Sequence, residues 1–158
     1  MFKFKKLFCL IGNYLPPKLN CFFYKISGVN FDPNKVWIGN NCYLDTNFPE
    51  NIIIKDHVCI SFKVTICCHF NTSKSIKNHL IKKYRKNVII EKGVFIGPGS
   101  IIMPGVVLKE NTFIRAGSVI TKSTKPNSIV SGNPQKEEKI LNTRLASKIN
   151  NLNQKYLF

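Results

Sequence analysis

Residues 88–134 read VIIEKGVFIGPGSIIMPGVVLKENTFIRAGSVITKSTKPNSIVSGNP, and an aliphatic side chain returns at every sixth position of this stretch. A small or β-branched residue follows each of these positions four residues later. A helix repeats about every 3.6 residues and a strand about every 2, so neither explains this period. A six-residue repeat is typical of a parallel β-helix, in which short strands alternate with turns. The repeated aliphatic residues, which would fill its narrow interior, are Ile90, Ile96, Ile102, Leu108, Ile114 and Ile120.

The same register recurs nearer the N-terminus, where Ile54, Ile60 and Ile66 are also six residues apart. We therefore predict that the β-helix covers residues 36–134. The repeat is interrupted twice. Residues 47–51 should bulge outward, and the polar residues 71–86 should leave the coil as an excursion loop. That loop contains no acidic residue and carries six cations, Lys74, Lys77, Lys82, Lys83, Arg85 and Lys86.

Both ends of the chain have helical patterns. Residues 1–28 form an N-terminal helical segment, because apolar residues are spaced helically after Pro17 and Gly28 is placed to end the helix. Its first part is short, basic and amphipathic, and either packs on the end of the coil or lies on a membrane surface. Residues 137–158 repeat apolar side chains every three or four positions and predict a C-terminal helix. The expected architecture is an all-β core with terminal helices, in a single domain over residues 1–158.

Composition narrows the function classes. The net charge of +16 over 158 residues favours anionic partners, although a general bias toward lysine would produce the same number. The sequence shows neither a signal peptide nor the roughly 20 apolar residues of a membrane span. The six cysteines form no CxxC pair, so we expect reduced thiols. These features predict a cytoplasmic protein, with peripheral membrane contact through the first helix as an alternative.

Four motifs carry a resemblance to a known family. They are Val94-Phe95-Ile96-Gly97, residues 102–106 (IMPGV), residues 114–122 (IRAGSVITK) and residues 132–136 (GNPQK). The chain resembles the hexapeptide-repeat acyltransferases, and within them the galactoside, maltose, xenobiotic and surface-polysaccharide O-acetyltransferases. The resemblance implies a left-handed parallel β-helix, acetyl-CoA as co-substrate, no metal, and a homotrimer with active sites between subunits.

Family members use one histidine as general base, placed just before an excursion loop, and His69 has that position. Physical reasoning supports the same residue, because His69 follows the inward-facing Ile66 by three positions and should point outward. An imidazole, with an ordinary pKa of about 6.5, can take a proton from a sugar hydroxyl as that oxygen attacks a thioester. His57 and His79 are better interpreted as solvated side chains.

A general base needs a partner on its second ring nitrogen. The resemblance implies an Asn or Asp from the preceding coil, and Asp45 falls near that place. The irregular step after Leu44 loosens the alignment, so Asp45 could equally be a simple turn residue, and Asn47 is the next candidate.

The resemblance also implies where CoA lies. Gly105 should stack beside His69 and leave room for the pantetheine arm. Pro98 departs from many relatives because it has no N–H to face the thioester carbonyl, so Gly99 or another group would serve instead. The residues implied to contact CoA are Gly97, Gly99, Gly105, Ala116, Gly117, Lys122, Pro134 and Lys136.

We therefore predict an acetyl-CoA-dependent O-acetyltransferase that acts on a sugar or glycan hydroxyl in surface polysaccharide biosynthesis. Within the class, the alternatives are N-acetylation of an amino sugar and acetylation of serine or a xenobiotic. The charge of residues 71–86 favours an anionic acceptor, unless that loop is simply solvated. A β-helix carbonic anhydrase would need three zinc-binding histidines, which the spacing does not supply. Specific nucleic-acid binding is not expected, since the basic residues are not interleaved with stacking aromatics.

Overall fold

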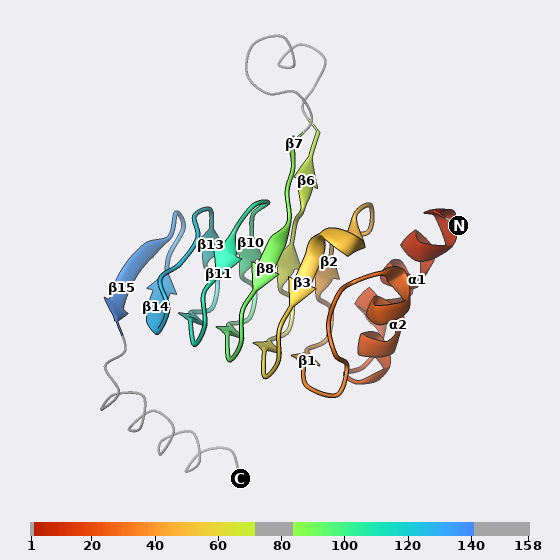
Figure 1. The fold of residues 1–158 in the computed structure, drawn as a ribbon, viewed down its shortest axis with the longest axis horizontal. Coiled ribbons are helices and arrows are strands. Elements are labelled where there is room, and N and C mark those ends of the chain that lie inside the picture. The colour runs from red at the N-terminus through yellow and green to blue at the C-terminus, as the bar shows by residue number, and fades with distance from the viewer. Residues whose placement is uncertain (1, 72–83, 141–158) are drawn as a thin grey trace.

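The computed structural model describes residues 2–71 and 84–140, with only the backbone described at 2–5 and 137–140. Helices α1 (Phe2–Tyr14) and α2 (Leu19–Ser27) pack together at the N-terminal end of the coil (Figure 1). Gly28 ends α2 in the left-handed conformation, at a φ of 111°, where a residue without a Cβ is favoured. No helix in this part of the chain is long and apolar enough to cross a membrane.

The strands of the coil form three sheets, beside a separate two-stranded hairpin, and consecutive coil strands up to β14 enter different sheets. The six-stranded sheet contains, in order, β1 (Trp37–Ile38), β4 (Cys59–Ile60), β9 (Phe95–Ile96), β12 (Phe113–Ile114), β14 (Ser128–Ser131) and β15 (Lys136–Ile140). The four-stranded sheet contains β13 (Val119–Ile120), β10 (Ile101–Ile102), β5 (Thr65–Ile66) and β2 (Tyr43–Leu44). The three-stranded sheet contains β11 (Val107–Leu108), β8 (Val88–Ile90) and β3 (Ile52–Ile54). Within these three sheets all neighbours except β14 and β15 are parallel, so the chain winds as the predicted parallel β-helix.

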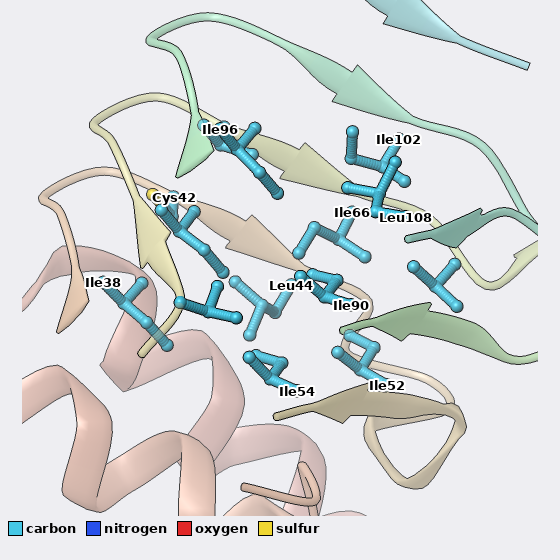
Figure 2. Close-up of a cluster of buried hydrophobic side chains, with 14 of the residues drawn as sticks. Ile38, Cys42, Leu44, Ile52, Ile54, Ile66, Ile90, Ile96, Ile102 and Leu108 are labelled. Atoms are coloured by element: carbon cyan, nitrogen blue, oxygen red, sulfur yellow. The ribbon is translucent and has the colours of Figure 1, made fainter. Parts of the chain in front are cut away.

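The repeated aliphatic residues form the interior of the coil, as the six-residue period predicts. Ile66, Ile102 and Ile120 lie one above another in the four-stranded sheet, and each is fully buried. Figure 2 shows how such residues from the three sheets meet in one narrow core. Burying each such side chain contributes about 1.5–3 kcal/mol. The small residues Ser100 and Ser118 are buried at the turns, where little space remains.

Two irregular segments interrupt the coil on the side that carries the candidate site. The first is the short 3-10 helix η1 (Pro49–Asn51), which lies within the predicted bulge. The second is a hairpin of β6 (His69–Phe70) and β7 (Tyr84–Arg85), whose strands pair antiparallel and project away from the coil (Figure 1). The backbone N–H of Lys86 donates to the carbonyl of Cys68 at 3.0 Å and closes its base. The excursion thus begins at His69, slightly before the predicted loop, and residues 72–83 lie outside the described residues.

The prediction of a C-terminal helix from residue 137 is wrong at its start. Residues 136–140 form β15, which runs antiparallel to β14 after a turn at Gly132, where φ is 95°. This return strand covers the exposed edge of β14, whose backbone groups would otherwise lack partners. The helical spacing of the apolar residues did not reveal that the edge of β14 needs hydrogen-bond partners. The rest of the predicted helix, residues 141–158, lies outside the described residues.

Candidate active site

His69 lies where the chain leaves the four-stranded sheet for the three-stranded sheet. Cys67, two residues earlier, still donates its backbone N–H to the carbonyl of Ile102 at 3.0 Å. His69 then opens the hairpin opposite Arg85. Its side chain is 17% exposed, so the ring is held by its neighbours and still reaches solvent. The fold therefore presents one imidazole at a corner of the coil.

The Asp45 carboxylate comes from the neighbouring corner, directly after β2. Its Oδ2 lies 2.5 Å from Nδ1 of His69 and also accepts the backbone N–H of Cys68 at 2.9 Å. Its Oδ1 accepts the backbone N–H groups of Asn47 at 3.0 Å and Phe48 at 3.3 Å. The side chain is 2% exposed. These partners hold the carboxylate rigidly, and they show Asp45 as more than a turn residue, because it also orients the imidazole.

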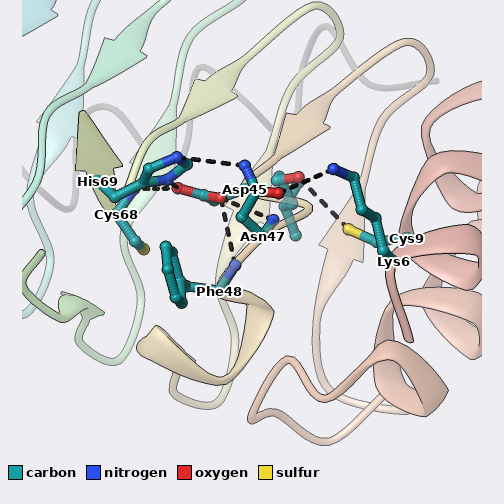
Figure 3. A network of polar contacts seen from close by, with 8 residues as sticks. Lys6, Cys9, Asp45, Asn47, Phe48, Cys68 and His69 are labelled. Atoms are coloured by element: carbon teal, nitrogen blue, oxygen red, sulfur yellow. Dashed lines mark hydrogen bonds and ion pairs between the residues drawn. The ribbon is translucent and has the colours of Figure 1, made fainter. Parts of the chain in front are cut away.

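Asn47, the second candidate from the sequence, contacts the other ring nitrogen. Its Nδ2 lies 3.2 Å from Nε2 of His69, and its Oδ1 accepts a hydrogen bond from Lys6 Nζ at 2.9 Å (Figure 3). Lysine can only donate, so Oδ1 must face Lys6 and the NH₂ group must face His69. Because Asp45 can only accept when ionised, Nδ1 carries the proton and Nε2 is left as an acceptor. This tautomer is the one that a general base requires.

Aromatic contacts fix the face of the imidazole. The Phe48 ring meets His69 edge to face at 4.9 Å between centroids, and the Arg85 guanidinium lies 4.7 Å from the centroid of the same Phe48 ring. Sequence reasoning missed Phe48 and Lys6 as parts of the site, and it named Arg85 only as one of the cations of residues 71–86. Only the cross-strand pairing of Arg85 with His69 and the packing of α1 bring them there, and neither follows from local spacing.

The thiols beside the site are poor nucleophiles. Burial, with a further contribution from the nearby Asp45 carboxylate, raises the pKa of the Cys68 thiol to about 12, and the same causes raise the pKa of Cys67. Reactive cysteines need a lowered pKa, since the thiolate is the nucleophile. The group available for proton transfer is therefore the imidazole, and no covalent cysteine step is indicated.

Two glycines expected to contact CoA also have partners within the coil. A Cβ on Gly97 would lie 2.5 Å from the backbone nitrogen of Ala116, so this buried glycine allows adjacent turns of the coil to approach closely. The N–H of Gly99 donates to the carbonyl of Phe62 at 3.1 Å. The N–H of Gly99 is therefore already used within the coil, which favours another group in place of the N–H that Pro98 lacks. A Cβ on Gly99 would meet nothing within 4 Å, so the surface here is open.

The remaining expected CoA contacts separate into two groups. Ala116 and Gly117 are exposed beside Gly99, at the corner between the six-stranded and four-stranded sheets. Lys122 and Gly105 instead follow the four-stranded sheet, at the corner that carries His69. A Cβ on Gly105 would lie nearest to the side chains of Lys86 and Tyr84, which flank Arg85, the residue paired with His69. Within one chain, Gly105 and Lys122 therefore lie at the corner of His69, whereas Ala116 and Gly117 lie at another corner.

The C-terminal motif lies next to Lys122. Oε1 of Gln135 accepts the backbone N–H groups of Thr121 at 2.6 Å and Lys122 at 2.8 Å. Pro134 and Lys136, on either side of Gln135, are exposed. Gln135 was not singled out from the sequence, although it lies in the quoted motif. No cluster of three or more His, Cys, Asp or Glu side chains that could hold a metal is present in residues 2–71 and 84–140.

Comparison with known proteins gives a match to one family model, and it also gives similar sequences and similar structures. Residues 87–122 match the family described as bacterial transferase hexapeptide (six repeats). The galactoside O-acetyltransferase of Lactococcus lactis is 31% identical over 134 residues, which are 82% of this chain and 62% of that protein. This chain therefore spans less than two thirds of the length of that relative.

Solved structures share the architecture. A maltose O-acetyltransferase from Clostridium difficile superposes with a TM-score of 0.62 at 22% identity, covering 89% of this chain and 86% of that chain. A hexapeptide-repeat acetyltransferase from Vibrio cholerae, solved with acetyl-CoA, gives 0.61 at 16% identity, covering 89% and 87%. At these identities the structures establish a common fold.

Proposed function

Because this chain belongs to the hexapeptide-repeat acetyltransferase family, we propose that it transfers an acetyl group from acetyl-CoA to a sugar hydroxyl. The observation that carries the proposal is the His69–Asp45 pair, an imidazole held with Nε2 as an acceptor and Nδ1 on a buried carboxylate. That arrangement suits a general base, whereas the thiols nearby do not suit a nucleophile.

In the proposed reaction, acetyl-CoA supplies the acetyl thioester and His69 moves the proton. Nε2 takes the hydroxyl proton as the acceptor oxygen bonds to the thioester carbonyl carbon. Asp45 stabilises the imidazolium that results, through the 2.5 Å contact at Nδ1. As the carbon–sulfur bond breaks, Nε2 returns the proton to the departing sulfur. Both the base and the acid step then use one ring nitrogen, and no metal enters the reaction.

The proposed co-substrate fits the exposed residues of two corners. Gly99 and Gly117 leave open surface, since a Cβ on either would meet nothing within 4 Å. Lys122 and Lys136 are exposed cations that can bind phosphates. Because Gly99 and Gly117 lie at a different corner of the chain from His69 and Lys122, a second copy would be needed to place both sets on one CoA. This supports the proposal of a homotrimer with active sites between subunits, built on the left-handed coil of its relatives.

The place of this activity is also a proposal. We take the acceptor to belong to surface polysaccharide synthesis and the protein to be cytoplasmic. Helices α1 and α2 support peripheral membrane contact, because several of their large apolar side chains remain exposed after packing on the coil. These side chains are Leu7, Leu10, Ile11, Tyr14, Leu19, Phe22 and Ile26. The same surface would equally suit contact between subunits.

The test is acetyl-CoA binding by calorimetry, followed by thiol release with hydroxy and amino sugars, for the wild type, His69→Ala and His57→Asn. His57 is exposed and has a φ of 60°, which asparagine tolerates, so His57→Asn is the matched control. We expect His69→Ala to bind acetyl-CoA and lose at least about 100-fold in rate, with the control unchanged. A wild type that does not bind acetyl-CoA contradicts the proposal, and turnover of amines alone contradicts O-acetylation.

A further inference from the structure

The N-terminal helix contributes a cation to the side of the site that must receive the acceptor. Lys6, on α1, hydrogen-bonds to Asn47, and Asn47 in turn contacts the Nε2 atom of His69. Figure 3 shows this line of side chains from α1 to the imidazole. Lys6 is separated from Asn47 by 41 residues in sequence, so this contact depends on the packing of α1 against the coil. The Cys9 thiol supports that packing by donating to the carbonyl of Leu44 at 3.3 Å.

The Asn47 amide occupies the position that an acceptor hydroxyl needs. A hydroxyl must donate to Nε2 before His69 can take its proton, and at present the Asn47 NH₂ group makes that hydrogen bond at 3.2 Å. The acceptor therefore has to displace the amide. When it does, its neighbouring groups come to lie beside Asn47 and Lys6, because these two side chains are already hydrogen-bonded to each other.

A second cation lies on another side of the imidazole. Arg85 stacks over Phe48, the ring that meets His69 edge to face. Within the described part of the chain, neither Lys6 nor Arg85 forms an ion pair with a carboxylate. The oxygens of the buried Asp45 accept from His69 and from the backbone N–H groups of residues 47, 48 and 68, and not from Lys6 or Arg85. Among the described residues, both cations are thus left without a direct carboxylate partner.

We propose that the acceptor is an anionic sugar, and that Lys6 and Arg85 bind its carboxylate or phosphate while its hydroxyl replaces the Asn47 amide at Nε2 of His69. This rests on the proposed acetyl transfer and deepens it by naming the substrate class. A neutral sugar would leave both cations facing it without a counter-charge. An anion gains charge-assisted hydrogen bonds there, which are the stronger kind. Lys6 and Arg85 are thus specificity residues, and His69 remains the base.

The experiment compares matched acceptors: glucuronate with glucose, and glucose 1-phosphate with methyl glucoside. Each pair is assayed with the wild type, Lys6→Met, Arg85→Met and the control Lys55→Met, an exposed lysine at a different corner of the coil. We expect the wild type to prefer one anionic acceptor by at least about tenfold in kcat/KM. Lys6→Met and Arg85→Met should each lower that value about tenfold or more, and change the neutral acceptor less than about twofold. The preferred pair identifies carboxylate or phosphate.

Failure of this inference is distinct from failure of the proposed function. Equal turnover of charged and neutral acceptors, or equal losses on both in Lys6→Met, overturns the anionic acceptor and leaves acetyl transfer standing. Calorimetric titration of glucuronate and glucose 1-phosphate gives a readout without turnover. Anion binding that Lys6→Met weakens, in a protein that transfers no acetyl group, overturns the activity and supports the subsite. Absence of both anion binding and anion preference overturns the inference.

Discussion

The Asp45 carboxylate faces Nδ1 of His69 at 2.5 Å while only 2% of its side chain is exposed. Three backbone N–H groups share the carboxylate with the imidazole, from Asn47, Phe48 and Cys68. The pair is therefore built into the turn after β2, so its geometry does not depend on a bound acceptor. Several measurements follow from this relationship and from the coil that supports it.

Asp45→Asn should lower kcat by about 10²- to 10⁴-fold, because an amide can donate to Nδ1 and so favour the wrong tautomer of His69. It should also destabilise the fold by about 1–3 kcal/mol, since the amide NH₂ would face a backbone N–H on one side. Steady-state kinetics below the melting temperature, with KM for acetyl-CoA as a check on folding, separate the two effects. Asp32→Asn, at an exposed residue, is the control. A variant that keeps half of the wild-type kcat contradicts the role of Asp45.

Gly97→Ala and Gly99→Ala form a matched pair for the coil. A Cβ at residue 97 would lie 2.5 Å from the backbone nitrogen of Ala116, whereas one at residue 99 meets nothing within 4 Å. Residue 99 has a φ of 68°, so its substitution costs only about 1–2 kcal/mol of backbone strain. We expect Gly97→Ala to lower the urea midpoint clearly more than Gly99→Ala. Equal midpoints would show that the turns can separate without cost.

Stability should fall as the pH rises above 9. Burial raises the pKa of the Cys9 and Cys68 thiols to about 12 and that of Cys42 to about 11, from an ordinary value of 9.0. The unfolded chain therefore loses these protons first, so the stabilisation is complete below pH 9 and is lost as the pH rises toward 11 and 12. Urea unfolding at pH 8 and pH 10 measures the loss. Cys42→Ala should show a smaller decrease between the two values, and an identical decrease would assign the effect to other groups.

Gln135→Met should raise KM for acetyl-CoA several-fold and leave kcat nearly unchanged. Oε1 of Gln135 holds the backbone of Thr121 and Lys122, and methionine keeps the length of the side chain without the acceptor. The change would loosen a proposed phosphate contact without touching His69. Lys122→Met should change KM in the same direction. If Lys122→Met raises KM and Gln135→Met does not, the Gln135 contacts are not needed to place that lysine.

The coil could be predicted because its inward-facing residues repeat at a fixed six-residue period in the sequence. Each aliphatic residue from Ile90 to Ile120 faces one narrow core, so a single period fixes strand register over the whole stretch. His69 could be located from the same register. Its partners were harder to assign, because the irregular step after Leu44 breaks the period just where Asp45 and Asn47 lie.

Other parts of the site depend on packing that no local pattern expresses. Lys6 reaches Asn47 only because α1 packs on the coil, and the spacing of its apolar residues also allowed a helix on a membrane surface. Arg85 lies opposite His69 because β6 and β7 pair antiparallel. The number of residues between the two strands does not predict which residues pair. Residues 137–140 were predicted as the start of a helix but belong to β15. The reason for the strand is the unpaired edge of β14, which the sequence of residues 136–140 does not reveal.

The closed base of the hairpin has an evolutionary consequence. Because Lys86 returns to hydrogen-bond Cys68, the coil resumes beside the residue from which it departed. The stacking of Ile66 on Ile102 therefore does not depend on how many residues lie between β6 and β7. Insertions, deletions or wholesale exchange of that segment between relatives would leave the β-helix and the His69–Asp45 pair intact. The length of that segment can thus change without moving the strands on either side of it.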